Sequence, residues 1–351
     1  MRRAIDLARR GWGQVAPNPL VGAVVVRDGV VVGEGYHARF GTAHAEPVAL
    51  GAAADRARGS TVYVTLEPCA HLGKTPPCVD ALIAAGVARV VAAVPDPNPT
   101  ASGGAARLAA AGVLVEFGVL AEDARELNAA FFNAFESERA WITLKLALSL
   151  DGAIAPAAGL QRWMTSEESR AAVHQLRAGA DGIAAGIGTV LVDDPELRVR
   201  AAAAPRLAPV RIVFDRHARL PTTSVLVRTA RETPTLVVAS APDAGRAAAL
   251  RAEGVDVVTA ATLVDAMKLI RARGVRSLLV EGGATLASAL VSERLVDRLV
   301  IFHAPVLLGA RAVASFGALP AAAATAAGRL ALLRSEPSGD DVMSTYALRF
   351  R

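Results

Sequence analysis

The chain has 351 residues, of which 53% are hydrophobic and 20% are charged, and its formal net charge is +5. This composition excludes a largely disordered chain, because disorder needs few apolar residues and a high net charge. The length favours two domains, and the basic residues are scattered among acidic ones, so charge gives little support for nucleic-acid binding.

The chain begins with a charged segment, residues 1–10, which is too polar for the apolar core of a signal peptide. No run of about 18 or more apolar residues without a charge follows, so the sequence predicts no membrane span. We therefore expect a cytoplasmic protein, whose two cysteines, Cys69 and Cys78, stay reduced.

In residues 1–138, apolar β-branched runs alternate with alanine-rich stretches, which is typical of α/β layering. Helices are predicted near 3–11, 45–57, 78–85, 103–111 and 121–138. Strands are predicted near 20–27, 30–34, 61–66, 88–94 and 113–117. The segment Arg27-Asp28-Gly29 is typical of a hairpin turn between the first two strands.

A new alternation begins at Trp141. Further strands are predicted near 141–146, 181–185, 210–215, 235–239, 255–258, 276–280 and 297–303. Helices are predicted near 166–178, 243–252, 262–272 and 284–292, and the Ala/Pro-rich stretch 201–209 is predicted to be a loop. We place the domain boundary near residue 140, with one domain over residues 1–139 and a second over residues 140–351.

The strongest chemical signal is His44-Ala45-Glu46, followed by Pro68-Cys69 and then Cys78. One imidazole and two thiolates suit a catalytic zinc ion that keeps an open fourth position. A metal there lowers the pKa of a bound water toward neutrality. Glu46 lies close enough to His44 in sequence to move protons between that water and a leaving amine. The order His-x-Glu and then Pro-Cys-x-x-Cys is the signature of zinc nucleobase deaminases.

The second cysteine is displaced from that signature, because Cys69 and Cys78 enclose eight residues rather than two. Two buried small hydrophobic residues are the simpler interpretation of such a pair, but the nearby His-x-Glu favours a metal site. His71 is a rival ligand. We interpret it instead as a loop residue near the site, because the other three ligands already leave the open position that catalysis needs.

Several segments of the first half together resemble the deaminase half of the bifunctional riboflavin-biosynthesis deaminase/reductase family. They are Asn18-Pro19-Leu20-Val21-Gly22, Gly33-Glu34-Gly35-Tyr36-His37, His44-Ala45-Glu46, the long loop from Pro68 to Cys78, and Asp96-Pro97-Asn98-Pro99. The widened loop distinguishes this family from other cytidine-deaminase-like enzymes. The resemblance implies a cytidine-deaminase-like α/β/α layered domain. It also implies hydrolytic removal of the 2-amino group from 2,5-diamino-6-(5-phosphoribosylamino)pyrimidin-4-one.

The same resemblance implies roles for individual residues. A Zn²⁺ ion would be held by His44, Cys69 and Cys78, and Glu46 would be the proton donor. Substrate contacts are implied for Asn18, Lys74 and Asn98. Pro47 stands where the family usually has an aliphatic residue. A proline is tolerated in a first helical turn, because its missing N–H would have no intrahelical partner there.

Three segments of the second half are candidates for a nucleotide and phosphosugar site, although its first strand is not followed by the dinucleotide fingerprint G-x-G-x-x-G. At Glu281-Gly282-Gly283, glycines would let backbone N–H groups approach a phosphate, although a plain strand-to-helix turn fits equally well. Residues 186–200 combine glycines, a pair of aspartates and arginines suited to phosphate. Lys145 within an apolar strand is unusual unless it is paired or faces a pocket. Thr165 or Ser166 is predicted to cap the next helix.

These segments resemble the reductase half of the same family and occur in its order. The matches are Leu-Lys-x-Ala-x-Ser-Leu-Asp-Gly from Leu144, Trp-x-Thr-Ser from Trp163, the run from Thr189 to Arg200, and Glu-Gly-Gly-x-Thr-Leu from Glu281. The resemblance implies a dihydrofolate-reductase-like α/β domain. It would use NADPH to reduce the ribosyl group of 5-amino-6-(5-phosphoribosylamino)uracil to ribityl.

The reductase resemblance also assigns residues. NADPH contacts are implied for Ala147, Trp163, Thr189, Asp193, Gly283, Ala284, Thr285 and Leu286. Substrate contacts are implied for Lys145, Gln161, Arg177, Leu197, Arg200 and Glu281. Gln161 departs from the family, which often has serine there, but an amide still donates and accepts hydrogen bonds. Either Lys145 or Asp193 would assist proton transfer on the sugar.

We therefore predict a two-domain enzyme that uses Zn²⁺ and NADPH and acts on small phosphoribosylaminopyrimidines. It is expected to bind neither nucleic acid nor membrane, and the resemblance implies a homo-oligomer. The alternative is a nucleic-acid base deaminase with a non-catalytic C-terminal binding domain. That alternative predicts an aromatic and basic groove beside the zinc, which a chain with 4% aromatic residues and scattered charge disfavours.

Overall fold

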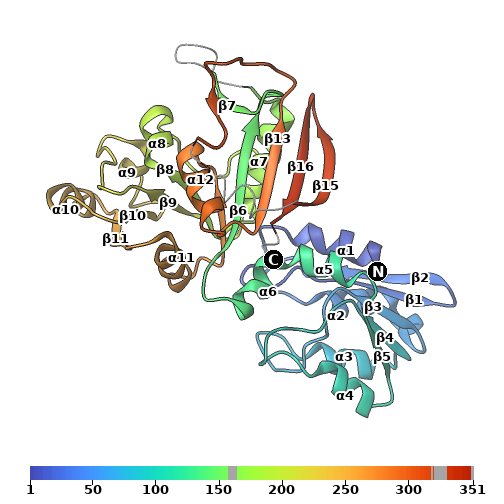
Figure 1. Cartoon of the computed structure of the whole chain (residues 1–351). Coiled ribbons are helices and arrows are strands. Elements are labelled where there is room, and N and C mark those ends of the chain that lie inside the picture. Colours follow the sequence, from blue (N-terminus) through green and yellow to red (C-terminus); the bar gives the residue numbers. More distant parts are fainter. Residues whose placement is uncertain (157–163, 318, 320–329, 349–351) are drawn as a thin grey trace. The chain divides into compact units, whose positions relative to one another are not determined.

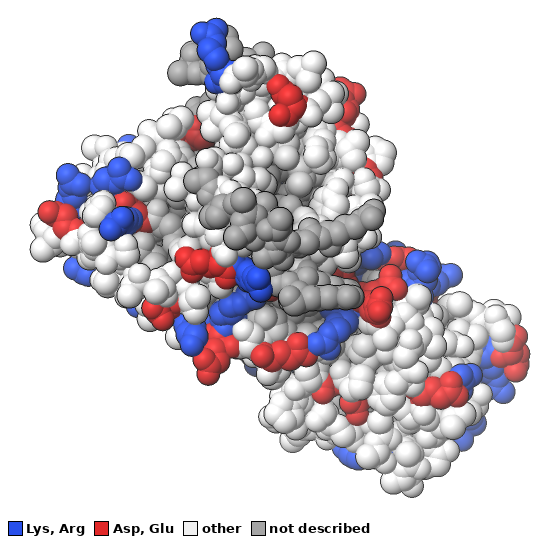
Figure 2. All heavy atoms as spheres, in the orientation of Figure 1, with Lys and Arg blue, Asp and Glu red and all other residues white. Residues whose placement is uncertain are grey.

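The computed structural model describes residues 1–156, 164–317, 319 and 330–348. Two of the predicted site residues, Gln161 and Trp163, lie outside the described residues. The chain folds as two compact units, Met1–Glu136 and Ser137–Arg351 (Figure 1). None of the helices in the described ranges is both long and apolar enough to cross a membrane. Figure 2 shows basic and acidic side chains interspersed on the visible face of each unit, in agreement with the scattered charges of the sequence.

The first unit is built on a five-stranded sheet in the order β2-β1-β3-β4-β5. Its strands are β1 (Gly22–Arg27), β2 (Val30–Tyr36), β3 (Thr61–Val64), β4 (Arg89–Ala92) and β5 (Leu114–Phe117). Strand β1 runs antiparallel to both β2 and β3, whereas β3, β4 and β5 are parallel. As a result, the carboxyl ends of β2, β3 and β4 meet at one edge of the sheet.

Helices cover both faces of this sheet. On one face, α2 (Ala45–Ala53), α3 (Cys78–Ala84) and α4 (Gly104–Ala110) share an apolar core with Ala23 and Val25 of β1. On the other lie α1 (Arg2–Ala8), α5 (Ala121–Leu127) and α6 (Ala129–Glu136), and α1 packs there against Val24 of the same strand. In Figure 1, α1 and α5 lie on one side of the strands, and α3 and α4 lie on the other. The predicted α/β/α layering is confirmed.

Most predicted elements of the first unit are confirmed within a few residues of their expected ends. The hairpin turn is confirmed by the positive φ angles of Asp28 (50°) and Gly29 (76°), the left-handed pair that a tight two-residue hairpin requires. Short 3₁₀ turns, Arg9–Gly11 and Ala54–Ala57, extend α1 and α2 as far as the predicted helices reached.

The single helix predicted over 121–138 is wrong, because the structure divides it at Asn128 into α5 and α6. The buried Asn128 side chain accepts a hydrogen bond from the backbone N–H of Leu20 (2.8 Å) and donates one to its carbonyl (2.9 Å). The Asn128 backbone leaves the helical region, with φ −109°. A side chain that bonds a distant backbone segment in this way competes with the helix.

Within the described residues, the second unit contains a nine-stranded sheet in the order β11-β10-β9-β8-β12-β6-β13-β16-β15. The strands from β11 to β13 in this order are parallel, and β16 and β15 complete the sheet as an antiparallel pair. The bounds are β6 (Trp141–Leu148), β8 (Gly182–Gly186), β9 (Val210–Phe214), β10 (Thr235–Ala239), β11 (Asp256–Thr259), β12 (Ser277–Val280), β13 (Arg298–His303), β15 (Ala331–Ser338) and β16 (Asp341–Ala347). A separate short pair joins β7 (Ala153–Ala155) to β14 (Val313–Ala314).

The helices of the second unit also cover both faces of its sheet. On one face, α11 (Leu263–Ala272) and α12 (Ala284–Ser292) contribute to the largest apolar core. On the other lie α7 (Glu167–Ala178), α8 (Ile187–Asp193), α9 (Val225–Arg228) and α10 (Ala244–Ala252). Ser166 caps α7, because its side chain accepts a hydrogen bond from the N–H of Ser169 (3.1 Å), which confirms one of the two predicted caps.

Six elements of the second unit, β7, β14, β15, β16, α8 and α9, were not predicted from the sequence, whereas the loop over 201–209 is confirmed. The hairpin β15–β16 lies at the edge of the sheet and most of β15 is exposed, so it lacks the apolar run of a central strand. Helices α8 and α9 are too short to show a helical period in the sequence.

We expect Asn128→Ala to destabilise the first unit by about 2–4 kcal/mol, because it leaves the N–H and carbonyl of Leu20 buried without partners. Trp12 packs in the same apolar cluster as Leu20, so urea unfolding followed by tryptophan fluorescence reports the change. The control is Asp123→Ala on the exposed surface of α5, which should change stability by less than about 0.5 kcal/mol. Equal stabilities for the two variants would contradict the bridging role of Asn128.

Candidate active sites

In the first unit, three predicted zinc ligands converge at the edge where strands β2, β3 and β4 end. His44 is the residue directly before α2, Cys69 follows β3, and Cys78 is the first residue of α3. Their ligand atoms all lie within 4.8 Å of one another. Among the described residues, His71, the rival ligand, lies outside this donor set.

The spacing of the three donor atoms fits a tetrahedral zinc ion. His44 Nδ1 lies 3.3 Å from Cys78 Sγ and 3.6 Å from Cys69 Sγ. With ordinary Zn–N and Zn–S bond lengths, a tetrahedral site places nitrogen and sulfur ligands about 3.6 Å apart. The other ring nitrogen of His44, Nε2, lies 3.4 Å from the Thr75 hydroxyl, which orients the ring with Nδ1 toward the sulfurs.

The two cysteines share one proton in this arrangement. The hydrogen bond from the Cys78 thiol lowers the pKa of Cys69 to about 4, and the resulting thiolate raises the pKa of Cys78. The Cys69 sulfur also accepts a hydrogen bond from the Cys78 backbone N–H (3.4 Å). A donor set that already holds negative charge is suited to a divalent cation, which would release the shared proton on binding.

Glu46 is the second residue of α2 and is only 3% exposed. Burial, with a smaller contribution from the charge of Cys69, raises the pKa of Glu46 to about 7. Pro47 follows it in the first helical turn, as expected. His44, Cys69 and Cys78 all influence this pKa, so the Glu46 carboxyl group lies near the donor atoms without belonging to the three-residue metal set.

Of the predicted substrate contacts in this unit, Asn18 is linked to the metal ligand His44 through His37. Its Nδ2 lies 3.2 Å from Nε2 of His37, and the His37 ring packs edge-on against the ring of His44 at 5.1 Å. His37 is 2% exposed and was assigned no role from the sequence. The available signal was its position directly after β2, at the edge where the metal ligands gather.

Lys74 and Asn98 lie on the two loops that follow β3 and β4. The Lys74 ammonium is exposed and stands over the ring of Phe40, 4.3 Å from its centre. Asn98 lies in the loop before α4, where Asp96 Oδ1 accepts a hydrogen bond from the Asn98 N–H (2.9 Å). Burial and the nearby charge of Glu67 raise the pKa of Asp96 to about 6.

In the second unit, a cavity of about 1420 Å³ opens at the carboxyl ends of the parallel strands. Ligand pockets usually measure about 300–1,000 Å³, so this one has room for a dinucleotide and a second molecule. Every predicted reductase residue within the described ranges lines it. These residues are Lys145, Ala147, Arg177, Thr189, Asp193, Leu197, Arg200, Glu281, Gly283, Ala284, Thr285 and Leu286.

An ion pair spans the floor of this cavity. Arg177 donates two hydrogen bonds to Glu281, from Nε to Oε1 (2.5 Å) and from Nη2 to Oε2 (2.9 Å). Burial opposes ionisation of Glu281, but the charges of Arg177 and Lys145 outweigh it and hold the pKa of Glu281 below its usual range. Burial also lowers the pKa of Lys145, which Glu281 partly offsets. Lys145 thus lines a pocket and lies near a carboxylate, as we expected for a lysine within an apolar strand.

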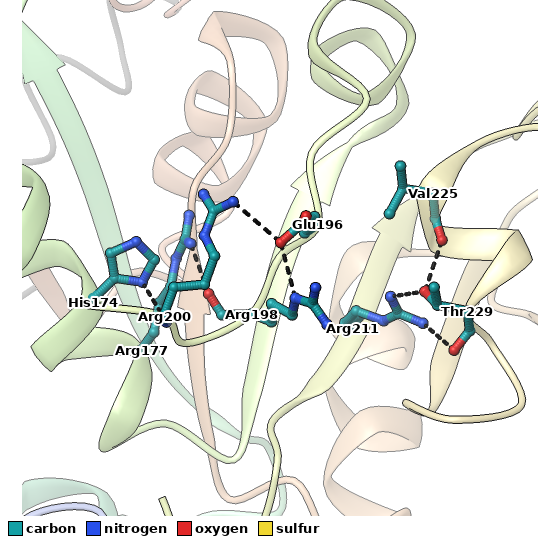
Figure 3. A network of polar contacts seen from close by, with 8 residues as sticks. All are labelled: His174, Arg177, Glu196, Arg198, Arg200, Arg211, Val225 and Thr229. Atoms are coloured by element: carbon teal, nitrogen blue, oxygen red, sulfur yellow. Dashed lines mark hydrogen bonds and ion pairs between the residues drawn. The ribbon is translucent and has the colours of Figure 1, made fainter. Parts of the chain in front are cut away.

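A second polar network borders the cavity (Figure 3). One carboxylate oxygen of Glu196 accepts hydrogen bonds from Arg198 (2.9 Å) and Arg200 (3.1 Å). Nδ1 of His174 accepts the backbone N–H of Arg200 (3.2 Å). Burial and the charges of Arg177 and Arg200 lower the pKa of His174, consistent with a neutral ring that accepts this bond. Of the two arginines that pair with Glu196, Arg200 lines the cavity, as Arg177 and Glu281 do, and Arg198 does not.

The nearby Arg211 is part of the core rather than of the cavity. Figure 3 shows its guanidinium turned toward Thr229, away from Glu196. It donates to the carbonyls of Leu226, Thr229 and Thr233 and to the hydroxyls of Thr229 and Thr235. Burial lowers the pKa of Arg211 to about 10. Its contacts are those of a structural residue.

Two of the predicted cofactor segments lie against each other. Gly283 directly precedes α12, and a Cβ built on it would lie 3.4 Å from the Thr189 hydroxyl of α8. Backbone N–H groups at a helix start attract phosphate. Leu197 has a left-handed backbone (φ 46°) and a buried side chain. Its backbone is therefore the part of the residue that a ligand in the cavity could contact.

Comparisons with known proteins match both units. Residues 1–94 match the cytidine and deoxycytidylate deaminase zinc-binding region, and residues 140–344 match the RibD C-terminal domain. The riboflavin biosynthesis protein RibD of Aquifex aeolicus is 43% identical over 88% of this chain and 87% of its own. That of Escherichia coli is 42% identical over 89% and 88%.

Solved structures agree with these matches. Acinetobacter baumannii RibD superposes with a TM-score of 0.83 at 37% identity, over 99% of this chain and 97% of its own. A diaminohydroxyphosphoribosylaminopyrimidine deaminase/5-amino-6-(5-phosphoribosylamino)uracil reductase from Thermotoga maritima gives a TM-score of 0.83 at 31% identity, with the same coverage. The predicted combination of a deaminase-like and a reductase-like α/β domain is confirmed.

Cys78→Ser should remove zinc from the purified protein, because it takes one donor from the set of three. His71→Ala should keep zinc, because His71 lies outside that set. Metal content measured by plasma mass spectrometry separates the two variants. Loss of zinc in His71→Ala would contradict the assignment of the ligands.

Proposed function

The chain belongs to the RibD family of riboflavin-biosynthesis enzymes, and from that premise we propose how its residues divide between two reactions. It is a bifunctional deaminase and reductase that depends on Zn²⁺ and NADPH. We assign residues 1–139 to the deaminase and residues 140–351 to the reductase. The alternative, a nucleic-acid base deaminase with an inert C-terminal domain, is disfavoured by the match of residues 140–344 to a reductase family.

The first reaction consumes one water and releases the 2-amino group of 2,5-diamino-6-(5-phosphoribosylamino)pyrimidin-4-one as ammonia. A zinc ion held by His44, Cys69 and Cys78 would supply a nucleophilic water of lowered pKa. The carboxylate of Glu46 would accept a proton from that water and donate one to the departing nitrogen. The observation that carries this assignment is a buried carboxyl group beside an N, S, S donor set with tetrahedral spacing.

The second reaction reduces the ribosyl carbon C1 of 5-amino-6-(5-phosphoribosylamino)uracil by two electrons. NADPH supplies the hydride, and the protein orients both molecules and supplies a proton to the ring oxygen as the sugar opens. We assign NADPH to Ala147, Thr189, Asp193 and the run from Gly283 to Leu286. Of the two groups expected to assist the proton transfer, Lys145 is favoured, because it is half-buried in the wall of the cavity, near Glu281, and its pKa is lowered.

We assign substrate-binding residues at the carboxyl edge of the sheet in each unit. Asn18, Lys74 and Asn98 would hold the substrate of the deaminase, and Lys145, Arg177, Leu197, Arg200 and Glu281 that of the reductase. The roles of Gln161 and Trp163 stay predictions from the sequence.

We also propose a homo-oligomer without a nucleic-acid partner. A cytoplasmic location is supported by the use of NADPH.

The function is tested by supplying the zinc-loaded protein with the diaminopyrimidine ribotide and adding NADPH later. Ammonia should appear before NADPH is added. After the addition, one NADPH should be oxidised for each ammonia released. Ammonia release without NADPH oxidation would overturn the reductase assignment. Activity on RNA or DNA with none on the ribotide would favour the nucleic-acid alternative.

We expect Glu46→Gln to keep zinc and to lose deamination by at least about a hundredfold, because the amide keeps the shape but acts neither as a general base nor as a general acid. Reduction of 5-amino-6-(5-phosphoribosylamino)uracil supplied directly should be unchanged, which serves as the control for folding. Ammonia release and metal content are the two measurements. If zinc is lost as well, Glu46 has a structural role at the metal site instead.

Arg200→Ala should raise the KM of the reductase for its phosphorylated substrate about tenfold or more, because a charge-assisted hydrogen bond contributes about 1.5–3 kcal/mol. The matched control is Arg198→Ala, which removes the same charge and the same ion pair with Glu196 but does not line the cavity. Its KM should change less than about twofold. Equal KM values for the two variants would contradict the role of Arg200.

A further inference from the structure

Glu67 is a buried carboxylate whose role no motif explains. It stands two residues before the metal ligand Cys69 and is only 7% exposed. Each of its carboxylate oxygens accepts one backbone hydrogen bond, Oε2 from the N–H of Asp96 (3.1 Å) and Oε1 from that of Ala105 (2.9 Å). Charge-assisted hydrogen bonds of this kind are stronger than neutral ones.

The two donors lie at opposite ends of one loop. Residues 93–103 connect β4 to α4, so Asp96 lies near the start of this loop and Ala105 just beyond its end. Asn98, the proposed substrate contact, lies between them. The backbone N–H of Glu67 donates to the carbonyl of Val94 (2.9 Å), which adds a third link to the same connection. Glu67 therefore closes the loop from both sides.

The interior of the loop leaves the Asn98 amide nitrogen available. Asp96 Oδ1 accepts the N–H of Asn98, and Asn98 Oδ1 accepts the N–H of Thr100 (3.1 Å). Within the described part of the chain, Nδ2 of Asn98 makes no hydrogen bond of its own. The orientation of this NH₂ group thus depends on the loop that Glu67 closes.

The same loop is packed against the segment that carries the metal ligand. The N–H of Ala70 donates to the carbonyl of Ala101 (3.0 Å). At Gly104, a Cβ would stand 1.8 Å from the carbonyl oxygen of Pro68, so the two backbones touch. Ala101 also packs in an apolar cluster with Cys69 and Cys78. These contacts join the loop to the segment that carries Cys69.

We propose that Glu67 is a positioning residue for deamination, which holds Asn98 at a fixed place relative to Cys69 by binding both ends of the loop. The proposal rests on the proposed role of Asn98 in binding the substrate. Glu67 itself touches neither substrate nor metal. Its carboxylate acts only through the backbone of Asp96 and Ala105.

Glu67→Gln tests the clamp with a minimal change of shape. A glutamine offers one oxygen to the two N–H donors, and its NH₂ group faces the other donor, so one end of the loop is released. We expect the KM for deamination to rise about fivefold while kcat changes less than about twofold, since a lost hydrogen bond is worth about 1 kcal/mol. Zinc content should stay unchanged. The control is Glu116→Gln, whose carboxylate pairs with Arg89 on the surface of the same unit, and its KM should stay at the starting value.

A double-mutant cycle with Asn98→Ala separates positioning from general damage. If Glu67 acts through Asn98, the single change Asn98→Ala raises KM about tenfold and adding Glu67→Gln raises it little further. Additive effects, zinc loss in Glu67→Gln, or an unchanged KM in that variant would each overturn the proposal. An unchanged KM in Asn98→Ala alone would overturn the substrate role of Asn98 together with this inference.

Discussion

Parallel strands bring their carboxyl ends to one edge of a sheet, and both sites of this chain depend on that constraint. In the first unit, the segments that follow β2, β3 and β4 carry His44, Cys69 and Asn98 to a common edge. In the second unit, β12 lies between β6 and β8, so Lys145, Thr189 and Glu281 meet at one cavity although they are far apart in sequence. The strand order thus determines which residues meet, and the loops supply the chemistry.

Burial of charge is the second feature that the two sites share. Burial, with a smaller contribution from the charge of Cys69, raises the pKa of Glu46, whereas the charges of Arg177 and Lys145 lower the pKa of Glu281. The first environment suits a group that exchanges protons. The second suits a fixed anion that orients cations and a sugar. The two carboxyl groups therefore suit different roles, because Glu46 is buried, whereas Glu281 lines a cavity beside two cations.

Local spacing explains how much of the two sites could be predicted from the sequence. The His44–Glu46 spacing and the Pro-Cys dipeptide are short-range patterns, so the metal ligands could be recognised from the order of residues alone. His37 and Glu67 were assigned no role, because their contacts are with residues 19 and 38 positions away and follow no periodic pattern. The helix end at Asn128 could not be predicted for the same reason, because it depends on a hydrogen bond to the distant Leu20. The edge hairpin β15–β16 lacked the apolar runs that marked the central strands.

We propose that the two active sites lie at the carboxyl edges of two separate sheets of one chain. A crystal structure of the protein loaded with zinc and NADPH, with anomalous data at the zinc edge, tests it most directly. We expect an anomalous peak between His44 Nδ1 and the sulfurs of Cys69 and Cys78. We also expect the nicotinamide to lie in the cavity bounded by Ala147 and Glu281. A zinc peak elsewhere, or NADPH bound outside that cavity, would contradict the claim.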